Sequence, residues 1–199
     1  MATTAGRPRA FDAGTVLDRA VDLFWKRGYR TTTTRDLEAV LGLSQSSLYN
    51  AFGSKHGLFM AALDRYENMT ATALLEPLEN SDRGLDAIDR FFVALGEWVT
   101  KDGRGGCMII NLMAEDGGDS DFVSIRTSAY RRRVRNALRD ALGRAADLGE
   151  TSHEDIGVRA DLLFAAVLGL NIAARGGSLR AEVERLAEAA RHLIRSWRN

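Results

Sequence analysis

The chain has 199 residues, 45% of them hydrophobic, with 27 Lys and Arg against 27 Asp and Glu and one cysteine. This composition predicts a folded chain with one or two small cores and excludes a disordered one. A single cysteine excludes an intrachain disulfide and cysteine-rich zinc modules, so we expect a reducing, cytoplasmic location. No secretory signal is visible in residues 1–12, and the longest apolar run, 162–170, is far shorter than the roughly 20 residues of a membrane span. We therefore expect no membrane partner.

The charge is unevenly distributed along the chain. Residues 1–55 contain eight basic and five acidic side chains, which leaves 19 basic and 22 acidic side chains in residues 56–199. A mildly basic head on a mildly acidic body suits a protein that presents one end to a polyanion.

Apolar residues recur at helical spacing between glycine clusters, and almost no stretch alternates apolar with polar residues. The predicted fold class is therefore all-α, with about nine helices. In the first part of the chain, Gly28 is expected to end the first helix, and Thr33 with Asp36 resembles a capping box for the second. The predicted helices cover about 12–27, 34–41, 45–52, 55–79, 85–99, 107–115, 120–146, 153–174 and 179–197.

Two short helices joined by a turn at Gly42, with Ser44 as the cap of the second, indicate a helix-turn-helix packed on the longer first helix. Leu48 and Phe52 are expected to point into the core. The outward face of the third helix then carries uncharged polar side chains, which suit base edges and phosphates. These side chains are Gln45, Ser46, Ser47, Tyr49 and Asn50. The alternative is an ordinary polar three-helix core.

A dense string of residues within positions 10–60 strongly resembles the DNA-binding domain of the TetR (TetR/AcrR) family of bacterial transcriptional regulators. The string comprises Gly28-Tyr29, Thr32-Thr33, Arg35-Asp36-Leu37, Gly42-Leu43-Ser44, Ser47-Leu48-Tyr49, Phe52, Ser54-Lys55 and Leu58-Phe59. The resemblance implies a homodimer on a palindromic operator in double-stranded DNA, and a small-molecule inducer that binds the C-terminal body and alters the spacing of the heads.

The resemblance also assigns DNA-binding roles to individual residues. Thr33, Tyr49 and Lys55 are expected to contact phosphates. Base reading is expected from Gln45, Ser46 and Ser47, and the predicted set is completed by Arg35 and Asn50. Glu38 departs from the family pattern, which often has a small residue there. Asn50-Ala51 stands where an aromatic residue or histidine is common, so the preferred base sequence is open.

The resulting domain prediction is a helix-turn-helix DNA-binding domain in residues 1–55 and a ligand-binding and dimerisation domain in residues 56–199. The eighth helix is apolar nearly all round between 162 and 170, so it must be covered on several faces. The ninth helix spaces apolar residues by three and four up to Trp197, which predicts a partner helix in this chain or in a second copy. We expect dimerisation through these two helices.

Aromatic, Met, Cys and Asn side chains of the body are the predicted ligand contacts, although such apolar residues at helical spacing are more often plain core. The predicted set is Phe91, Trp98, Cys107, Met108, Asn111, Phe122, Phe164 and Asn171. The two asparagines each need a hydrogen-bond partner if buried, which either a ligand or a backbone group can supply.

Cys107 lies in the string from Gly106 to Asn111, which resembles a segment in one branch of the TetR family. Some members of that branch sense electrophiles or oxidants through a cysteine. A thiol in the first turn of a helix, three residues after Arg104, is expected to have a lowered pKa. The alternative, which we favour, is that Cys107 is a small buried core residue.

Enzyme activity is not expected. His56, His153 and His192 lie in three different predicted helices, and none has a second ligand at metal spacing, so we predict no catalytic residue, metal or cofactor. The favoured function is a ligand-responsive repressor. The alternative is an all-α small-molecule-binding or scaffold protein whose head docks on protein. In the repressor, the helix that begins at Lys55 is expected to be the only lever between body and head.

Overall fold

A computed structural model describes residues 12–103, 105–116 and 121–199, so the predicted role of Arg104 lies outside the described residues. Within these ranges the secondary structure is entirely helical, which confirms the all-α prediction. The helices are α1 (Ala13–Arg27), α2 (Thr34–Leu41), α3 (Gln45–Phe52), α4 (Lys55–Thr70), a π-helical segment (Ala71–Leu75), α5 (Glu76–Glu79), α6 (Leu85–Thr100), a 3-10 turn (Lys101–Gly103), α7 (Met108–Asp116), α8 (Asp121–Asp147), α9 (Ile156–Arg175) and α10 (Arg180–Ser196).

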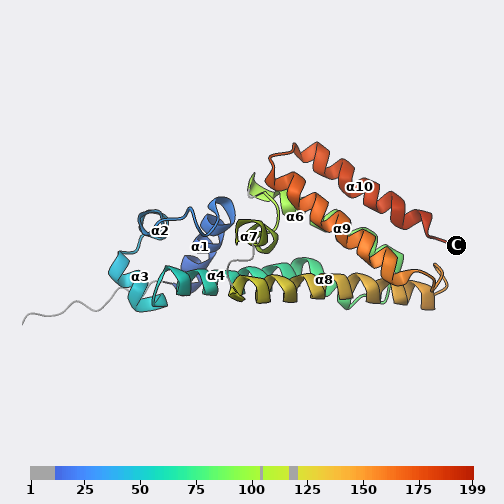
Figure 1. Ribbon diagram of the computed structural model, residues 1–199, viewed down its shortest axis with the longest axis horizontal. Helices are drawn as coiled ribbons and strands as arrows, with labels where there is room; N and C mark the ends of the chain where they lie inside the picture. The colour runs from blue at the N-terminus through green and yellow to red at the C-terminus, as the bar shows by residue number, and fades with distance from the viewer. Residues whose placement is uncertain (1–11, 104, 117–120) are drawn as a thin grey trace, which may run out of the picture.

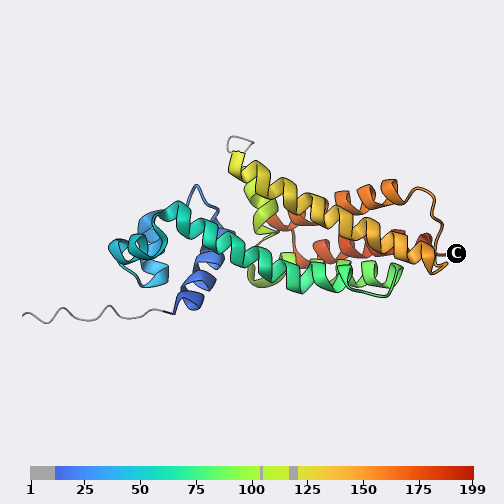
Figure 2. The same ribbon diagram turned by 90° about the horizontal axis from the view of Figure 1, so that it is seen from below.

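The molecule is elongated, with a small head at one end and a larger helical body at the other (Figure 1). The head consists of α1, α2 and α3, and the body of α4 to α10. Helix α4 leaves the head and runs into the body, as the turned view shows, while the C-terminus lies at the end remote from the head (Figure 2).

Local sequence signals set the helix boundaries in the head. Asp12 caps α1 by accepting hydrogen bonds from two backbone amides of the first turn, and Gly28 ends the helix with a φ of 84°. Thr33 and Asp36 form the predicted capping box at the start of α2, and Gly42 ends α2 in the left-handed region. Because these signals are local, the predicted boundaries agree with the structure.

The predicted fourth helix, 55–79, is interrupted. Residues 55–79 are helical throughout, but residues 71–75 form a π-helical turn between α4 and α5. Pro77 explains the position of this turn. A proline ring clashes with the carbonyl group four residues earlier, here that of Ala73, and a widened turn relieves such a clash.

The body buries one face of each long helix. Helix α10 packs along α6, and α8 packs along α9. The inward face of α10 carries small and branched apolar residues, and the outward face leaves two leucines exposed, Leu186 and Leu193. The inward residues of α10 are Val183, Ala187, Ala190 and Ile194.

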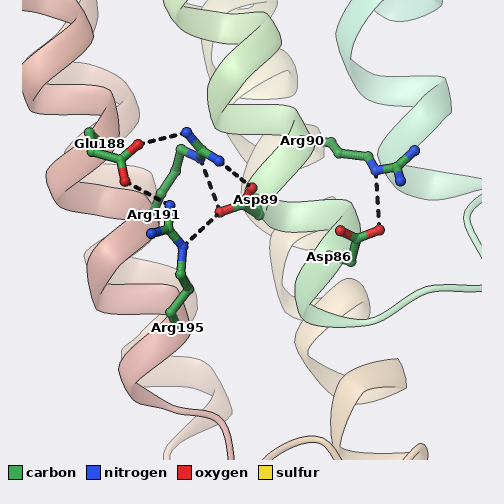
Figure 3. Close-up of polar contacts among 6 residues, drawn as sticks. All are labelled: Asp86, Asp89, Arg90, Glu188, Arg191 and Arg195. Carbon is green, nitrogen blue, oxygen red and sulfur yellow. Dashed lines mark hydrogen bonds and ion pairs between the residues drawn. The ribbon is translucent and has the colours of Figure 1, made fainter.

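An ion-pair network holds α10 on α6 (Figure 3). Arg191 of α10 donates to both carboxylate oxygens of Asp89 on α6, at 3.0 and 2.9 Å. Glu188 binds Arg191 at 2.6 Å and Arg195 at 2.7 Å, so both arginines are oriented from two sides. Such a fork geometry fixes the rotation of α10, and thereby which face of the helix points outward.

Helix α9 is covered on one face only. Leu163, Val167 and Leu170 are buried, whereas Val158 and Ile172 are 59% and 68% exposed. The expectation that this helix is covered on several faces is therefore not met within one chain. Among the described residues, α9 is also the one helix whose length and composition match a membrane span, a test that the core helices of globular proteins also pass.

Candidate functional site

The outward face of α3 is polar and uncharged, as predicted. Leu48 is fully buried and anchors α3 on the head, so the neighbouring positions on the helix point away from the core. Four of the five predicted polar residues are exposed, and Ser47 is half-buried. The exposed ones are Gln45, Ser46, Tyr49 and Asn50.

The polar side chains of α3 are held in place by hydrogen bonds along the helix. The Gln45 amide nitrogen donates to the Tyr49 hydroxyl at 3.2 Å. This bond is the leading cause that lowers the pKa of Tyr49. The Ser44 hydroxyl lies 3.0 Å from the hydroxyls of Ser46 and Ser47. The helix therefore presents an ordered row of amide and hydroxyl groups.

Glu38 has a role that the sequence did not suggest. Its carboxylate accepts a hydrogen bond at 2.7 Å from the backbone nitrogen of Gln45, the first residue of α3. A carboxylate at a helix N-terminus satisfies an unpaired amide and interacts favourably with the helix dipole. The departure from the family pattern at Glu38 thus ties α2 to the start of α3.

Of the three predicted phosphate contacts, Thr33 and Lys55 lie at the two ends of the α2–α3 unit, and Tyr49 lies on α3 itself. The Thr33 hydroxyl is engaged in the capping box, and Arg35, which was predicted to bind DNA without a specific role, is exposed on α2. The Lys55 ammonium group, at the start of α4, lies 4.5 Å from the centre of the Tyr29 ring. Partial burial there lowers the pKa of Lys55. The aromatic ring thus positions this cation beside α3, the predicted recognition helix.

The capping box gives the head a specific dependence on pH. Hydrogen bonds from the Thr33 side chain and backbone lower the pKa of Asp36 from 3.8 to about 2. Because the folded-state pKa lies below the unfolded value, this stabilisation is present above about pH 4 and is lost as the pH falls towards about 2.

We expect Asp36→Asn to lower the melting temperature at pH 5, and the difference from wild type to shrink as the pH falls to 2. Circular dichroism melts across this range measure the difference. Asp140→Asn, at an exposed carboxylate on α8, is the control. A difference that stays constant across the range would contradict the assignment.

The body contains a buried polar cluster around the turn that precedes α7. The hydroxyl of the fully buried Tyr66 accepts hydrogen bonds from the Trp98 indole nitrogen at 3.1 Å and from the Met108 backbone nitrogen at 3.2 Å. The Cys107 thiol donates to the Tyr130 hydroxyl at 3.8 Å. The roles of Tyr66 and Tyr130 were missed in the sequence analysis. Helical spacing indicates that their rings pack in the core but carries no information on what their hydroxyl groups bind.

The environment of Cys107 reverses the expectation of a lowered pKa. The side chain is 2% exposed, and burial raises the pKa of the thiol above its ordinary value. The favoured interpretation of Cys107 as a buried core residue agrees with this exposure. A buried thiol with a raised pKa carries little thiolate at neutral pH, which makes it a poor nucleophile.

Both predicted asparagines lie beside the turn that precedes α7, at Gly105 and Gly106. The Asn111 side-chain nitrogen donates to the Gly105 carbonyl at 2.9 Å, and the Asn171 side-chain nitrogen donates to the Val167 carbonyl at 2.7 Å. The side-chain oxygen of Asn171 is buried and has no hydrogen-bond partner among the described residues. Backbone groups therefore satisfy both nitrogens, and one acceptor remains available.

The structure does not bring all eight predicted ligand residues together. Trp98, Cys107, Met108, Asn111 and Asn171 gather around the α6–α7 turn.

The other three lie elsewhere. Phe91 is buried against Phe92, at a ring distance of 5.5 Å. Phe122 lines a cavity of 150 Å³ at the junction of head and body, and Phe164 lines a groove of 590 Å³ between α8 and α9.

The fold and the outward face of α3 define a class of protein: a helix-turn-helix head that binds DNA, joined to an all-helical body. Residues 16–62 match the family described as "Bacterial regulatory proteins, tetR family".

Two relatives and one solved structure are similar over most of the chain. The HTH-type transcriptional repressor ComR of Escherichia coli (strain K12) is 32% identical over 195 residues, which cover 96% of this chain and 91% of ComR. The uncharacterized HTH-type transcriptional regulator YezE of Bacillus subtilis (strain 168) is 31% identical over 78% of this chain and 80% of YezE. A structure of the TetR family regulator CifR, a cysteine mutant complexed with 26-bp double-strand operator DNA, is 29% identical with a TM-score of 0.82, covering 96% of this chain and all of that chain. This chain belongs to the TetR family and is a DNA-binding transcriptional regulator.

Proposed function

We propose that this regulator is a homodimeric repressor that binds a palindromic operator and is released by a small-molecule inducer. The DNA-binding domain is residues 1–55, and residues 56–199 bind the inducer and dimerise. The protein acts in the cytoplasm and has no enzyme activity. The uncharged, hydrogen-bonded face of α3 carries the proposal, and the repressor name of the relative ComR supports it.

Exposed apolar side chains on α9 and α10 support the dimer. Leu162 is 51% exposed on α9, on the helix face that also leaves Val158 and Ile172 uncovered. Leu186 and Leu193 lie seven residues apart on the outward face of α10. Two such adjacent stripes suit a symmetric four-helix contact with a second copy.

A mobility shift on genomic fragments tests DNA binding. We expect a palindromic footprint and an affinity that falls steeply with salt, because each phosphate contact releases counterions. A flat salt response would instead favour a head that docks on protein.

On the recovered operator, Gln45→Ala is expected to cost about 1–3 kcal/mol of binding free energy and to relax the base preference at one base pair per half-site. Tyr49→Ala is expected to weaken binding to every sequence alike. Asn136→Ala, at an exposed amide on α8, is the control.

The inducer site is proposed around the α6–α7 turn, where five of the predicted ligand residues meet. The unpaired side-chain oxygen of Asn171 supports a ligand that donates a hydrogen bond there. Because Cys107 is buried with a raised pKa, we propose a non-covalent inducer rather than an electrophile.

Treatment with N-ethylmaleimide at neutral pH is therefore expected to leave operator binding by the folded protein unchanged. The thiol should react rapidly only after unfolding in guanidinium, as mass spectrometry can show. Cys107→Ser serves as the control for modification at other sites. Release of DNA from wild type but not from Cys107→Ser would make Cys107 the trigger.

A further inference from the structure

The C-terminal end of α1 is bound directly by two parts of the body that are distant in sequence. The buried Trp25 indole nitrogen donates to the Gly106 carbonyl oxygen, in the turn before α7, at 2.8 Å. One guanidinium nitrogen of Arg175, the last residue of α9, lies 3.2 and 3.4 Å from the carbonyl oxygens of Trp25 and Lys26. Carbonyls in the last turn of a helix lack partners within the helix, and a cation there also complements the helix dipole.

Glu115 of α7 completes this contact. Its carboxylate accepts a hydrogen bond at 3.0 Å from the second terminal nitrogen of Arg175, and its backbone oxygen accepts one from Arg30 at 3.3 Å. The carboxylate also rests against Gly28, where an added Cβ atom would lie only 2.4 Å from each carboxylate oxygen. The α1 clamp is defined here as Trp25, Gly28, Glu115 and Arg175.

The α1 clamp is a second connection between head and body, in addition to the helix beginning at Lys55 that the sequence analysis expects to be the only lever. Helix α4 packs on α1 and leads into the body, whereas the clamp joins α1 to α7 and to the end of α9. A head connected to the body through one helix alone can rotate about the axis of that helix. A second contact at a distance from the helix prevents this rotation. Helix α9 also carries the exposed stripe assigned to the second copy.

We propose that Arg175 and Glu115 are positioning residues that fix the head relative to α9, and thereby set the spacing of the two recognition helices in the dimer. This inference rests on the proposed function and deepens it. A head released from the clamp must be ordered again when both heads bind their half-sites. The free energy of this ordering lowers the affinity for the full palindromic operator. Binding of one head to one half-site does not depend on that spacing.

The first test compares Arg175→Gln and Glu115→Gln with wild type on the full operator and on a single half-site duplex. Affinity for the full operator is expected to fall about 3- to 30-fold, a range typical of coupling between distant sites, with half-site affinity unchanged. Arg180→Gln is the matched control, because Arg180 forms a comparable pair with Glu184 at 2.8 Å on the surface of α10. Equal losses on both duplexes, unchanged operator affinity or tighter operator binding would each overturn the proposal.

A second test uses no DNA. Gly28→Ala introduces a Cβ atom against the Glu115 carboxylate as well as strain at a φ of 84°. The loss of melting temperature caused by Gly28→Ala is expected to be smaller in a Glu115→Ala background, because the steric conflict is absent there and only the backbone strain remains. Gly149→Ala, with a φ of 75° and nothing within 4 Å, supplies the strain alone and should show no such coupling. An equal loss in both backgrounds would show that the Glu115 carboxylate does not rest against Gly28, which would contradict the clamp as defined here.

Hydrogen exchange tests the α1 clamp independently of the proposed DNA-binding function. Backbone amides of residues 25–30 are expected to exchange faster in Arg175→Gln than in wild type, and unchanged exchange would count against the clamp. If wild type bound no DNA, the proposed function would fail, whereas the melting and exchange measurements would still decide whether the clamp restrains the head.

Discussion

Replacement of both Leu186 and Leu193 by aspartate is expected to convert the dimer into a folded monomer that has lost about 10²- to 10⁴-fold in operator affinity. Both side chains point outward on α10, at 43% and 37% exposure, so aspartate is tolerated in one chain but not when a second copy buries the position. The loss of affinity follows because two linked heads bind a palindrome with avidity that a single head lacks.

Sedimentation and a mobility shift on the same preparation measure this result. Ile125→Asp provides the control, since it places a charge on an equally apolar, exposed position of α8 outside the proposed interface. Circular dichroism should show unchanged helix content in both variants. A monomeric wild type, or a doubly substituted protein that still sediments as a dimer, would exclude this interface.

Trp25→Ala is expected to produce the largest loss of stability among the variants considered, about 3–5 kcal/mol. The indole is 1% exposed and packs edge-on against the Tyr66 ring at a centroid distance of 4.7 Å. Trp25→Phe keeps an aromatic ring but leaves the Gly106 carbonyl without its indole donor, so a smaller loss of about 1–3 kcal/mol is expected.

Urea denaturation followed by circular dichroism gives the free energy of unfolding for both variants. Trp197 is half-buried and directly follows α10, so Trp197→Phe controls for the effect of replacing an indole at a site remote from the head. Comparable small losses for Trp25→Ala and Trp197→Phe would show that the head is not anchored on the body through Trp25.

The sequence alone determined the helices of the head and the outward face of α3. Caps such as Thr33 with Asp36, and turn residues such as Gly42, act within a few positions of the chain. The burial of Leu48 fixes the direction of its neighbours through the period of the helix. Local patterns therefore predict the helix type, the helix boundaries and the candidate base-reading residues of the head.

The sequence did not indicate which of the predicted ligand residues lie together, because periodicity shows that a side chain is apolar but not which part of the body it packs in. Phe122 and Phe164 follow the same helical spacing as other body residues, yet one lies at the head–body junction and the other in a surface groove. Their separation depends on how α8 and α9 pack, which no local pattern specifies.

Only the tertiary structure decided the state of Cys107 and the attachment of the head. Proximity to a helix start predicted a lowered pKa, but burial, which depends on every surrounding helix, raises it. Arg175 lies 149 and 150 residues from the two carbonyls that it binds, and 60 residues from Glu115. Contacts of this kind arise from the mutual orientation of packed helices, and an arginine at the end of a helix has the same local sequence signal whether it binds another helix or only water.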